Sequence, residues 1–206
     1  MCIRDSLVGG HGAVDMGVMM RQRHLVAVLL VLGAVGCARE PEPQRIVEPR
    51  QSDRPAERGQ ALLRQVMLAS QNAARAAAGV APLTWSNGLA ADAHAYAGVL
   101  ARTGRFEHAA QPQGMAREGE NLWTGTRGAY SYREMVGHWV AERRDFTNGV
   151  TPAFSRTGRW EDVAHYAQIV WRGSTAMGCA LASNATDDYL VCRYSPPGNV
   201  VGERAF

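Results

Sequence analysis

Two cysteines in the last third of the chain are spaced so that they could form a disulfide across a β-hairpin. The segments MGCALA and YLVCRY alternate like strands, and pairing Cys179 with Cys192 leaves residues 183–188 as the loop. The same register sets Leu181 opposite Leu190. Because residues two apart on a strand share a face, directly opposed cysteines lie within disulfide reach. The spacing therefore predicts a disulfide-bonded hairpin.

The region around this hairpin resembles a known family. HYAQIVW followed by GC and then YLVCRYSPPGN, within residues 165–199, is similar to the paired signature blocks of the CAP superfamily of cysteine-rich secretory, antigen 5 and pathogenesis-related proteins. Residues 71–97 resemble the first two helices of plant and bacterial members, and GENLW from Gly119 resembles a further block. The resemblance covers about residues 60–206 and departs at Gln71, where the family often has His.

The resemblance implies a cleft that two histidines and two acids face. The matching residues are His108 in FEHA, Glu120 in GENLW, Glu142 in HWVAERRDF and His165 in AHYAQ. Neutral imidazoles are nitrogen ligands suited to zinc or a similar divalent ion, and a carboxylate beside each ring can fix its tautomer. Structural zinc sites nearly always have four ligands, so His108 and His165 predict a weakly held metal with water in the open positions.

Three interpretations of these four residues stay open. The leading one is a binding module without catalysis, for which the family implies lipid, sterol or other envelope ligands. Open metal positions would permit a metal-dependent hydrolase or protease with Glu120 or Glu142 as the base, although HExxH, G-x-S-x-G and a third metal ligand are missing. The four residues are purely structural in the third interpretation. For Glu142, an intrahelical pair with His138 is the simple alternative.

The N-terminal region predicts export. From Met20 an arginine-bearing start is followed by an apolar run over residues 25–35 and by small residues up to Cys37, which is typical of a signal peptide over 20–36. The apolar run is too short to span a bilayer. AVGC resembles a bacterial lipoprotein box, which implies acylation of Cys37 and attachment to the cell envelope; an ordinary secretory signal is the alternative. Residues 1–19 form a doubtful leader without signal-peptide features.

Patterns downstream of the signal divide the chain into a tether and one domain. Residues 37–59 are rich in proline, arginine and acids, which predicts a disordered tether. Helical spacing follows over residues 60–78, from Ser86 or Asn87 to about 103, and from a capping box at Ser131 to about 146. Residues 105–130 predict a long ordered loop with a short strand at GENLW. A helical turn at His165 and a strand over 168–171 precede the hairpin.

Three helices and at least three antiparallel strands, with the strands clustered late, predict an α+β fold. The family resemblance sharpens this to a three-layer α-β-α sandwich with a central antiparallel sheet over residues 60–206. The formal net charge of +3 is too small, and the 22 basic residues too scattered, for a nucleic-acid-binding protein. We expect a monomer that is attached to the membrane through its N-terminal lipid.

Overall fold

A computed structural model of the protein describes residues 54–112 and 114–206. The doubtful leader, the signal segment 20–36, the acylation candidate Cys37 and most of the tether lie outside the described residues. The end of the tether contacts the domain, since the backbone N–H of Ala56 donates to the carbonyl of Gly128 at 3.1 Å and Arg58 pairs with Asp188 at 2.7 Å. Within the described ranges, no helix has the length and apolar character that a membrane crossing requires.

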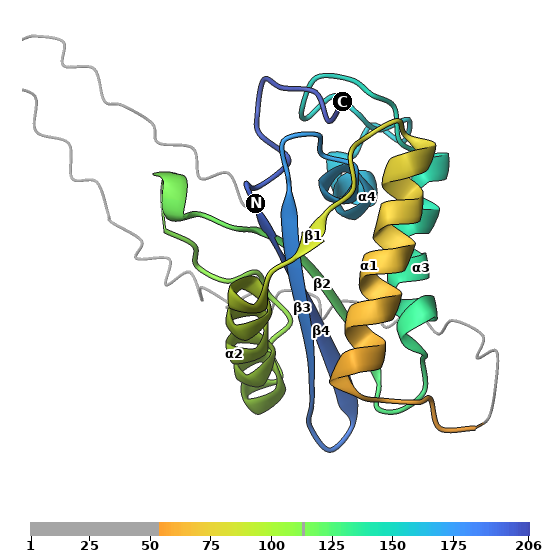
Figure 1. Ribbon diagram of the computed structural model, residues 1–206, viewed down its shortest axis with the longest axis vertical. Coiled ribbons are helices and arrows are strands. Elements are labelled where there is room, and N and C mark those ends of the chain that lie inside the picture. The colour runs from red at the N-terminus through yellow and green to blue at the C-terminus, as the bar shows by residue number, and fades with distance from the viewer. Residues whose placement is uncertain (1–53, 113) are drawn as a thin grey trace, which may run out of the picture. The chain divides into compact units, whose positions relative to one another are not determined.

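In the described region, helices and strands are interspersed along the chain (Figure 1). The helices are α1 (Gln60–Ala77), α2 (Asn87–Thr103), α3 (Tyr132–Ala141) and α4 (Ala164–Ile169), with 3-10 turns at Gly114–Ala116, Glu142–Arg144 and Trp160–Val163. The strands are β1 (Thr84–Trp85), β2 (Gly119–Thr126), β3 (Ala176–Ser183) and β4 (Asp187–Ser195). Their order in the sheet is β1-β3-β4-β2, antiparallel except where β1 pairs in parallel with β3.

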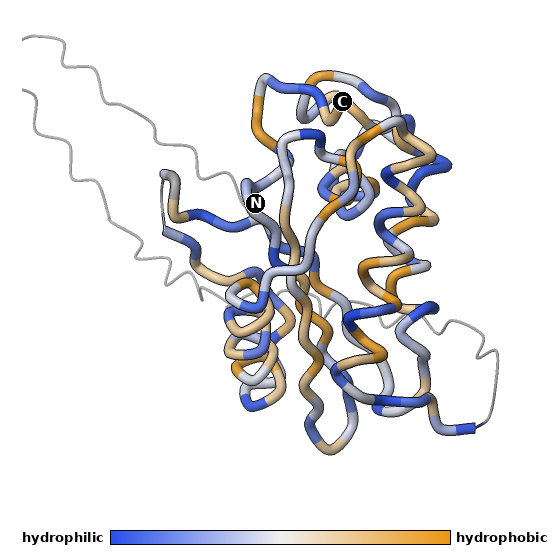
Figure 2. Tube along the Cα trace, in the orientation of Figure 1, coloured by the Kyte–Doolittle hydropathy of each residue, from blue (hydrophilic) through white to orange (hydrophobic). Residues whose placement is uncertain are grey.

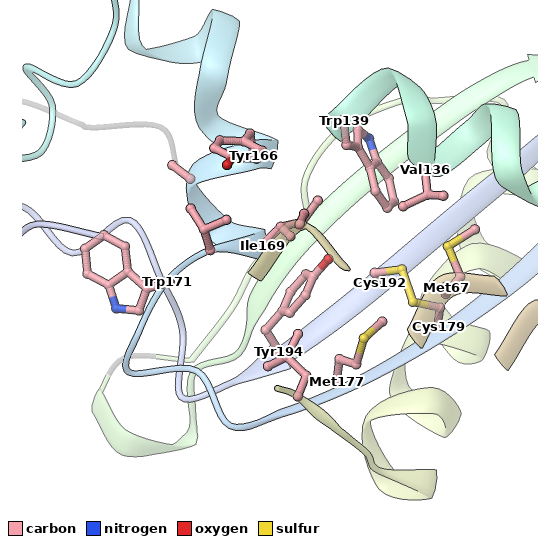
Figure 3. Close-up of a cluster of buried hydrophobic side chains, with 14 of the residues drawn as sticks. Met67, Val136, Trp139, Tyr166, Ile169, Trp171, Met177, Cys179, Cys192 and Tyr194 are labelled. Carbon is pink, nitrogen blue, oxygen red and sulfur yellow. A yellow bond between two sulfur atoms is a disulfide. The ribbon is translucent and has the colours of Figure 1, made fainter. Parts of the chain in front are cut away.

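Helices cover both faces of this sheet, which confirms the predicted three-layer α-β-α sandwich. Figure 1 shows α2 on one side of the strands and α1 with α3 on the other. The α2 side is a small cluster in which Ala93, Ala97 and Leu100 meet side chains of all three long strands. The opposite side is larger and holds Met67, Trp139 and Tyr194 (Figure 3). In Figure 2, α1 alternates between hydrophilic and hydrophobic colours, as expected for a helix with one buried face.

Local chemistry places the helix ends close to where the sequence predicts them. Ser86 caps α2 by accepting from the N–H of Leu89, and Gly104 ends the helix in the left-handed conformation with φ 68°. Ser131 and Glu134 form the predicted capping box at the start of α3. The α-helix ends at Ala141, earlier than predicted, and the chain continues as a 3-10 turn that begins with Glu142.

The hairpin forms with the predicted register. Cys179 lies opposite Cys192 and is disulfide-bonded to it, with Cα atoms 4.1 Å apart, and Leu181 lies opposite Leu190. The strands extend further than predicted, because Ser183 still pairs with Asp188 and only residues 184–186 form the loop. The hairpin therefore forms the centre of the sheet, flanked by β1 and β2.

The prediction of a strand over residues 168–171 is wrong. Gln168 and Ile169 are the end of helix α4, and Val170 follows in a turn. This short run is buried throughout, and a buried apolar run of a few residues fits a strand and a helix equally well. Contacts of α4 with α3 and β2 decide for the helix, and the same helix carries His165.

Close packing between α2 and the sheet depends on a glycine in β3. A Cβ atom at Gly178 would lie 2.2 Å from the backbone nitrogen of Ala90 and 2.7 Å from the carbonyl oxygen of Ser86. Neither backbone atom can move without shifting the start of α2. The glycine thus lets the start of α2 lie directly on β3.

Candidate functional site

The first pair of predicted site residues joins the loop after α2 to the start of β2. Nδ1 of His108 lies 2.7 Å from Oε1 of Glu120, and the same oxygen accepts from the backbone N–H of Ala109 at 3.0 Å. The side chain of Glu120 is 5% exposed, whereas that of His108 is 47% exposed. A buried carboxylate therefore holds an imidazole that reaches solvent.

The second pair joins the end of α3 to α4 in the same manner. Nδ1 of His165 lies 2.6 Å from Oε1 of Glu142, and Oε2 accepts from the backbone N–H of Tyr166 at 3.0 Å. The indole of Trp139 stacks on the His165 ring, with centroids 5.8 Å apart and planes 15° apart. Glu142 thus pairs with His165 and not with His138, whose Nδ1 accepts from Nε1 of Trp123 at 2.9 Å.

Both acids use one arrangement to orient their histidine. Each carboxylate contacts Nδ1 of the ring and accepts from the backbone N–H of the next residue, Ala109 or Tyr166. A carboxylate facing Nδ1 selects the tautomer with the proton on that nitrogen, which leaves the lone pair on Nε2. This is the usual outer-shell arrangement of a metal-ligating histidine.

Consecutive residues of β2 connect the two pairs. Glu120 belongs to the first pair, and Nδ2 of Asn121 donates to the carbonyl of His165 at 3.1 Å. The same amide contacts the Tyr194 hydroxyl, which donates to Oε1 of Gln71 at 2.9 Å. Burial raises the pKa of Tyr194 well above its ordinary value, so this hydroxyl stays protonated and able to donate. Gln71 thus lies at the far end of a buried chain of polar contacts to the site.

The two pairs do not form a closed metal cage. Within residues 54–112 and 114–206, no three or more His, Cys, Asp or Glu side chains gather closely enough to hold an ion. A hollow of about 380 Å³ lies elsewhere, at the start of α1 beside the hairpin, and none of the four residues lines it. The four residues fit two imidazole ligands, each oriented by a carboxylate in the outer shell. They do not form the closed tetrahedral site of a structural zinc.

Arg193 lies against the first pair and was not predicted from the sequence. Its Nη2 approaches Oε2 of Glu120 at 2.7 Å in an ion pair, and its Nη1 donates to Oε2 of Glu118 at 3.0 Å. Burial raises the pKa of Glu118, and the hydrogen bond and charge of Arg193 oppose this shift. The sequence feature that could have identified Arg193 is its charge within the otherwise apolar strand YLVCRY, on the face opposite to the disulfide.

The model of the "CAP: Cysteine-rich secretory protein family" matches residues 68–194, which contain all four site residues and both bonded cysteines. The chain belongs to the CAP family. Its CAP domain is 39% identical over 141 residues to a pathogenesis-related protein of the PR-1 type from Sambucus nigra, a match that covers 66% of this chain and 78% of the relative. Pathogenesis-related protein 1B of Nicotiana tabacum is 35% identical over 143 residues, covering 69% of this chain and 80% of the relative.

Solved structures share the fold of this CAP domain. NaASP2, solved with Zn²⁺, superposes with a TM-score of 0.58 at 19% identity, covering 75% of this chain and 88% of that chain. BmVAL-1 superposes with a TM-score of 0.57 at 22% identity, covering 74% of this chain and 85% of that chain. At these identities the likeness establishes the architecture of the CAP domain, and the activity has to be argued from its own residues.

Proposed function

We propose that this CAP domain is a binding module without catalysis that holds a divalent metal ion weakly through Nε2 of His108 and of His165. The observation that carries the proposal is the repeated carboxylate contact to Nδ1, which orients both rings and leaves Nε2 as the ligand atom. The two rings are 47% and 30% exposed, so an ion can reach them from solvent. NaASP2, which has the same fold, was solved with Zn²⁺.

The positions of the two acids favour binding over hydrolysis. A general base must have a lone pair directed at the water or substrate whose proton it takes. Glu142 uses one oxygen on the His165 ring and the other on the N–H of Tyr166. Glu120 uses one oxygen on His108 and Ala109, and its other oxygen lies against Arg193. Both oxygens of each carboxylate thus have a partner within the protein, which favours a positioning role for the acids and a ligand-holding role for the site.

Zinc titration of the metal-free protein by calorimetry tests this role. We expect the wild-type domain to bind zinc and the double variant His108→Ala/His165→Ala to lose that binding, because both ligand atoms are removed. His94→Ala, an exposed histidine of α2, is the matched control and should bind as the wild type does. Equal zinc binding by the double variant would refute the assignment. If neither the wild type nor any variant binds zinc and the double variant has a lower melting temperature than the wild type, the purely structural interpretation is favoured.

We further propose that the module is exported and attached to a bacterial envelope through an acylated Cys37, where its site faces lipid, sterol or other envelope ligands. The buried disulfide supports an oxidising compartment. We expect the full chain to fractionate with membranes and Cys37→Ser to be released into the soluble exported fraction, as detected by immunoblotting. Membrane retention of Cys37→Ser would contradict the lipid anchor and leave the metal-binding proposal unaffected.

A further inference from the structure

We infer that Arg193 is a positioning residue for His108, acting through the carboxylate of Glu120 and through Tyr96, and that the His165 half of the site is held independently of it. The inference deepens the proposed function, on which its metal-binding consequence rests. The positioning itself concerns the metal-free protein and can be tested separately.

The first route runs through the side chain of Glu120. Arg193 of β4 lies directly opposite Glu120 of β2 in the antiparallel ladder, so both side chains project from the same face of the sheet. Their side chains are 7% and 5% exposed, and Nη2 lies 2.7 Å from Oε2. With Oε2 held by the guanidinium, Oε1 is directed at Nδ1 of His108 and the N–H of Ala109.

The second route runs through Tyr96 of α2 to the backbone next to His108. The guanidinium of Arg193 lies over the Tyr96 ring, 5.3 Å from its centroid. The hydroxyl of Tyr96 donates to the carbonyl of Glu107 at 2.7 Å, and Glu107 immediately precedes His108. Arg193 therefore contacts the supports of both the ring and the backbone of His108.

The His165 half has supports of a different kind. Its ring lies between Glu142 and the stacked indole of Trp139, and its carbonyl accepts from Asn121. Asn121 follows Glu120 on β2, and successive side chains of a strand point to opposite faces. Glu120 and Asn121 thus reach the two halves from opposite faces of β2, and Arg193 shares the face of Glu120. A change at Arg193 therefore acts on the His108 half and leaves the contacts of the His165 half in place.

Removing the arginine leaves a buried carboxylate without its cation. Such a group is strongly disfavoured and turns towards water or towards another donor. We therefore expect Arg193→Met to release Oε1 of Glu120 from His108. Arg193→Lys keeps the charge but replaces a planar fork with a single ammonium group, which cannot contact Glu118 and Glu120 in the same geometry. Its effect on His108 should be intermediate.

Imidazole ¹⁵N NMR of the metal-free protein reads each histidine separately and does not depend on zinc. We expect His108 in the wild type to give the signal of the tautomer protonated at Nδ1, with partial loss of that signal in Arg193→Lys and full loss in Arg193→Met. The His165 signal should be the same in all three. Because Arg193→Lys keeps the buried charge, it replaces Arg193→Met as the test variant if Arg193→Met does not fold.

Glu118→Gln is the matched control, since it alters the other carboxylate that Arg193 contacts and leaves the ion pair with Glu120. It should leave the His108 signal unchanged. An unchanged His108 signal in Arg193→Met, or an equal loss in Glu118→Gln, would overturn the inference, because the signal would then not depend on the contact between Arg193 and Glu120.

Zinc affinity gives the functional consequence. Loss of an outer-shell contact weakens metal binding by about tenfold or more. Arg193→Met alone should therefore weaken zinc binding by about this factor. When His108→Ala is already present, adding Arg193→Met should have no effect on zinc binding. Equal losses in both backgrounds would overturn the positioning role. If the wild type binds no zinc, the proposed function fails, while the NMR signals of the metal-free protein still decide the role of Arg193.

Discussion

Replacing Arg75 by methionine is expected to lower the free energy of unfolding by about 4 kcal/mol, the combined cost of several buried carbonyl groups that lose a charged donor. Arg75 is 1% exposed in α1. Its guanidinium donates to four backbone carbonyls at 2.6–2.9 Å, those of Ala81, Ile169, Trp171 and Ser174. Three of these hydrogen bonds, those to Ile169, Trp171 and Ser174, are buried.

This arginine holds the helix that carries half of the site. Ile169 is the last residue of α4, and its carbonyl is one of those that a helix C-terminus leaves without an internal partner. A cation at this end of a helix also interacts favourably with the helix dipole. Burial lowers the pKa of Arg75, although an arginine remains charged at neutral pH. The buried charge thus fixes α4, and with it His165, against α1.

Urea unfolding followed by circular dichroism measures this effect. Arg64→Met is the matched control, because Arg64 is an exposed arginine of the same helix whose guanidinium lies over the Trp85 ring. Its replacement should cost less than about 1 kcal/mol. A cost below about 1 kcal/mol for Arg75→Met as well would show that the carbonyls find other donors, and the role assigned to Arg75 would be wrong.

Removing the disulfide with Cys179→Ala/Cys192→Ala is expected to lower the free energy of unfolding by about 3 kcal/mol. The two cysteines are 13 residues apart in sequence, and the chain-entropy model assigns about this value to a loop of similar length. Both are fully buried between the hairpin and α1, where Met67 packs (Figure 3), so truncation also removes packing.

The wild-type protein provides its own control for this prediction. A reductant strong enough to open the bond should lower wild-type stability towards that of the double variant and should leave the variant unchanged. Unfolding midpoints in urea with and without the reductant make the comparison. Equal stability of the variant and the oxidised wild type would contradict the assigned contribution.

The helix caps and the hairpin register, which depend on neighbours in sequence, were predicted correctly, whereas the end of α3 was placed too late. The cap at Ser86, the left-handed Gly104 and the capping box at Ser131 each follow from hydrogen bonds within a few residues. The hairpin register follows from the two-residue period of a strand, which places Cys179 against Cys192. The strand predicted over residues 168–171 failed because its run of buried residues carries no local signal that separates a helix from a strand.

The same distinction between local and long-range contacts applies to the candidate site. Its four residues were recognised through motifs that each lie within a few positions of the chain, but metal binding by them stays a prediction. Which acid serves which histidine depends on contacts 12 and 23 residues apart, and the supports from Arg193 and Arg75 span 73 to 99 residues.

The sequence by itself determined the N-terminal caps of α2 and α3 and the register of the bonded hairpin, because short-range geometry is the same in any fold. The candidate residues came from the resemblance of short motifs to the CAP family. Only the tertiary structure decided the pairing of those residues and the choice of their buried partners. A charged side chain becomes a support only when distant segments enclose it together with a group of opposite charge or a set of carbonyl oxygens.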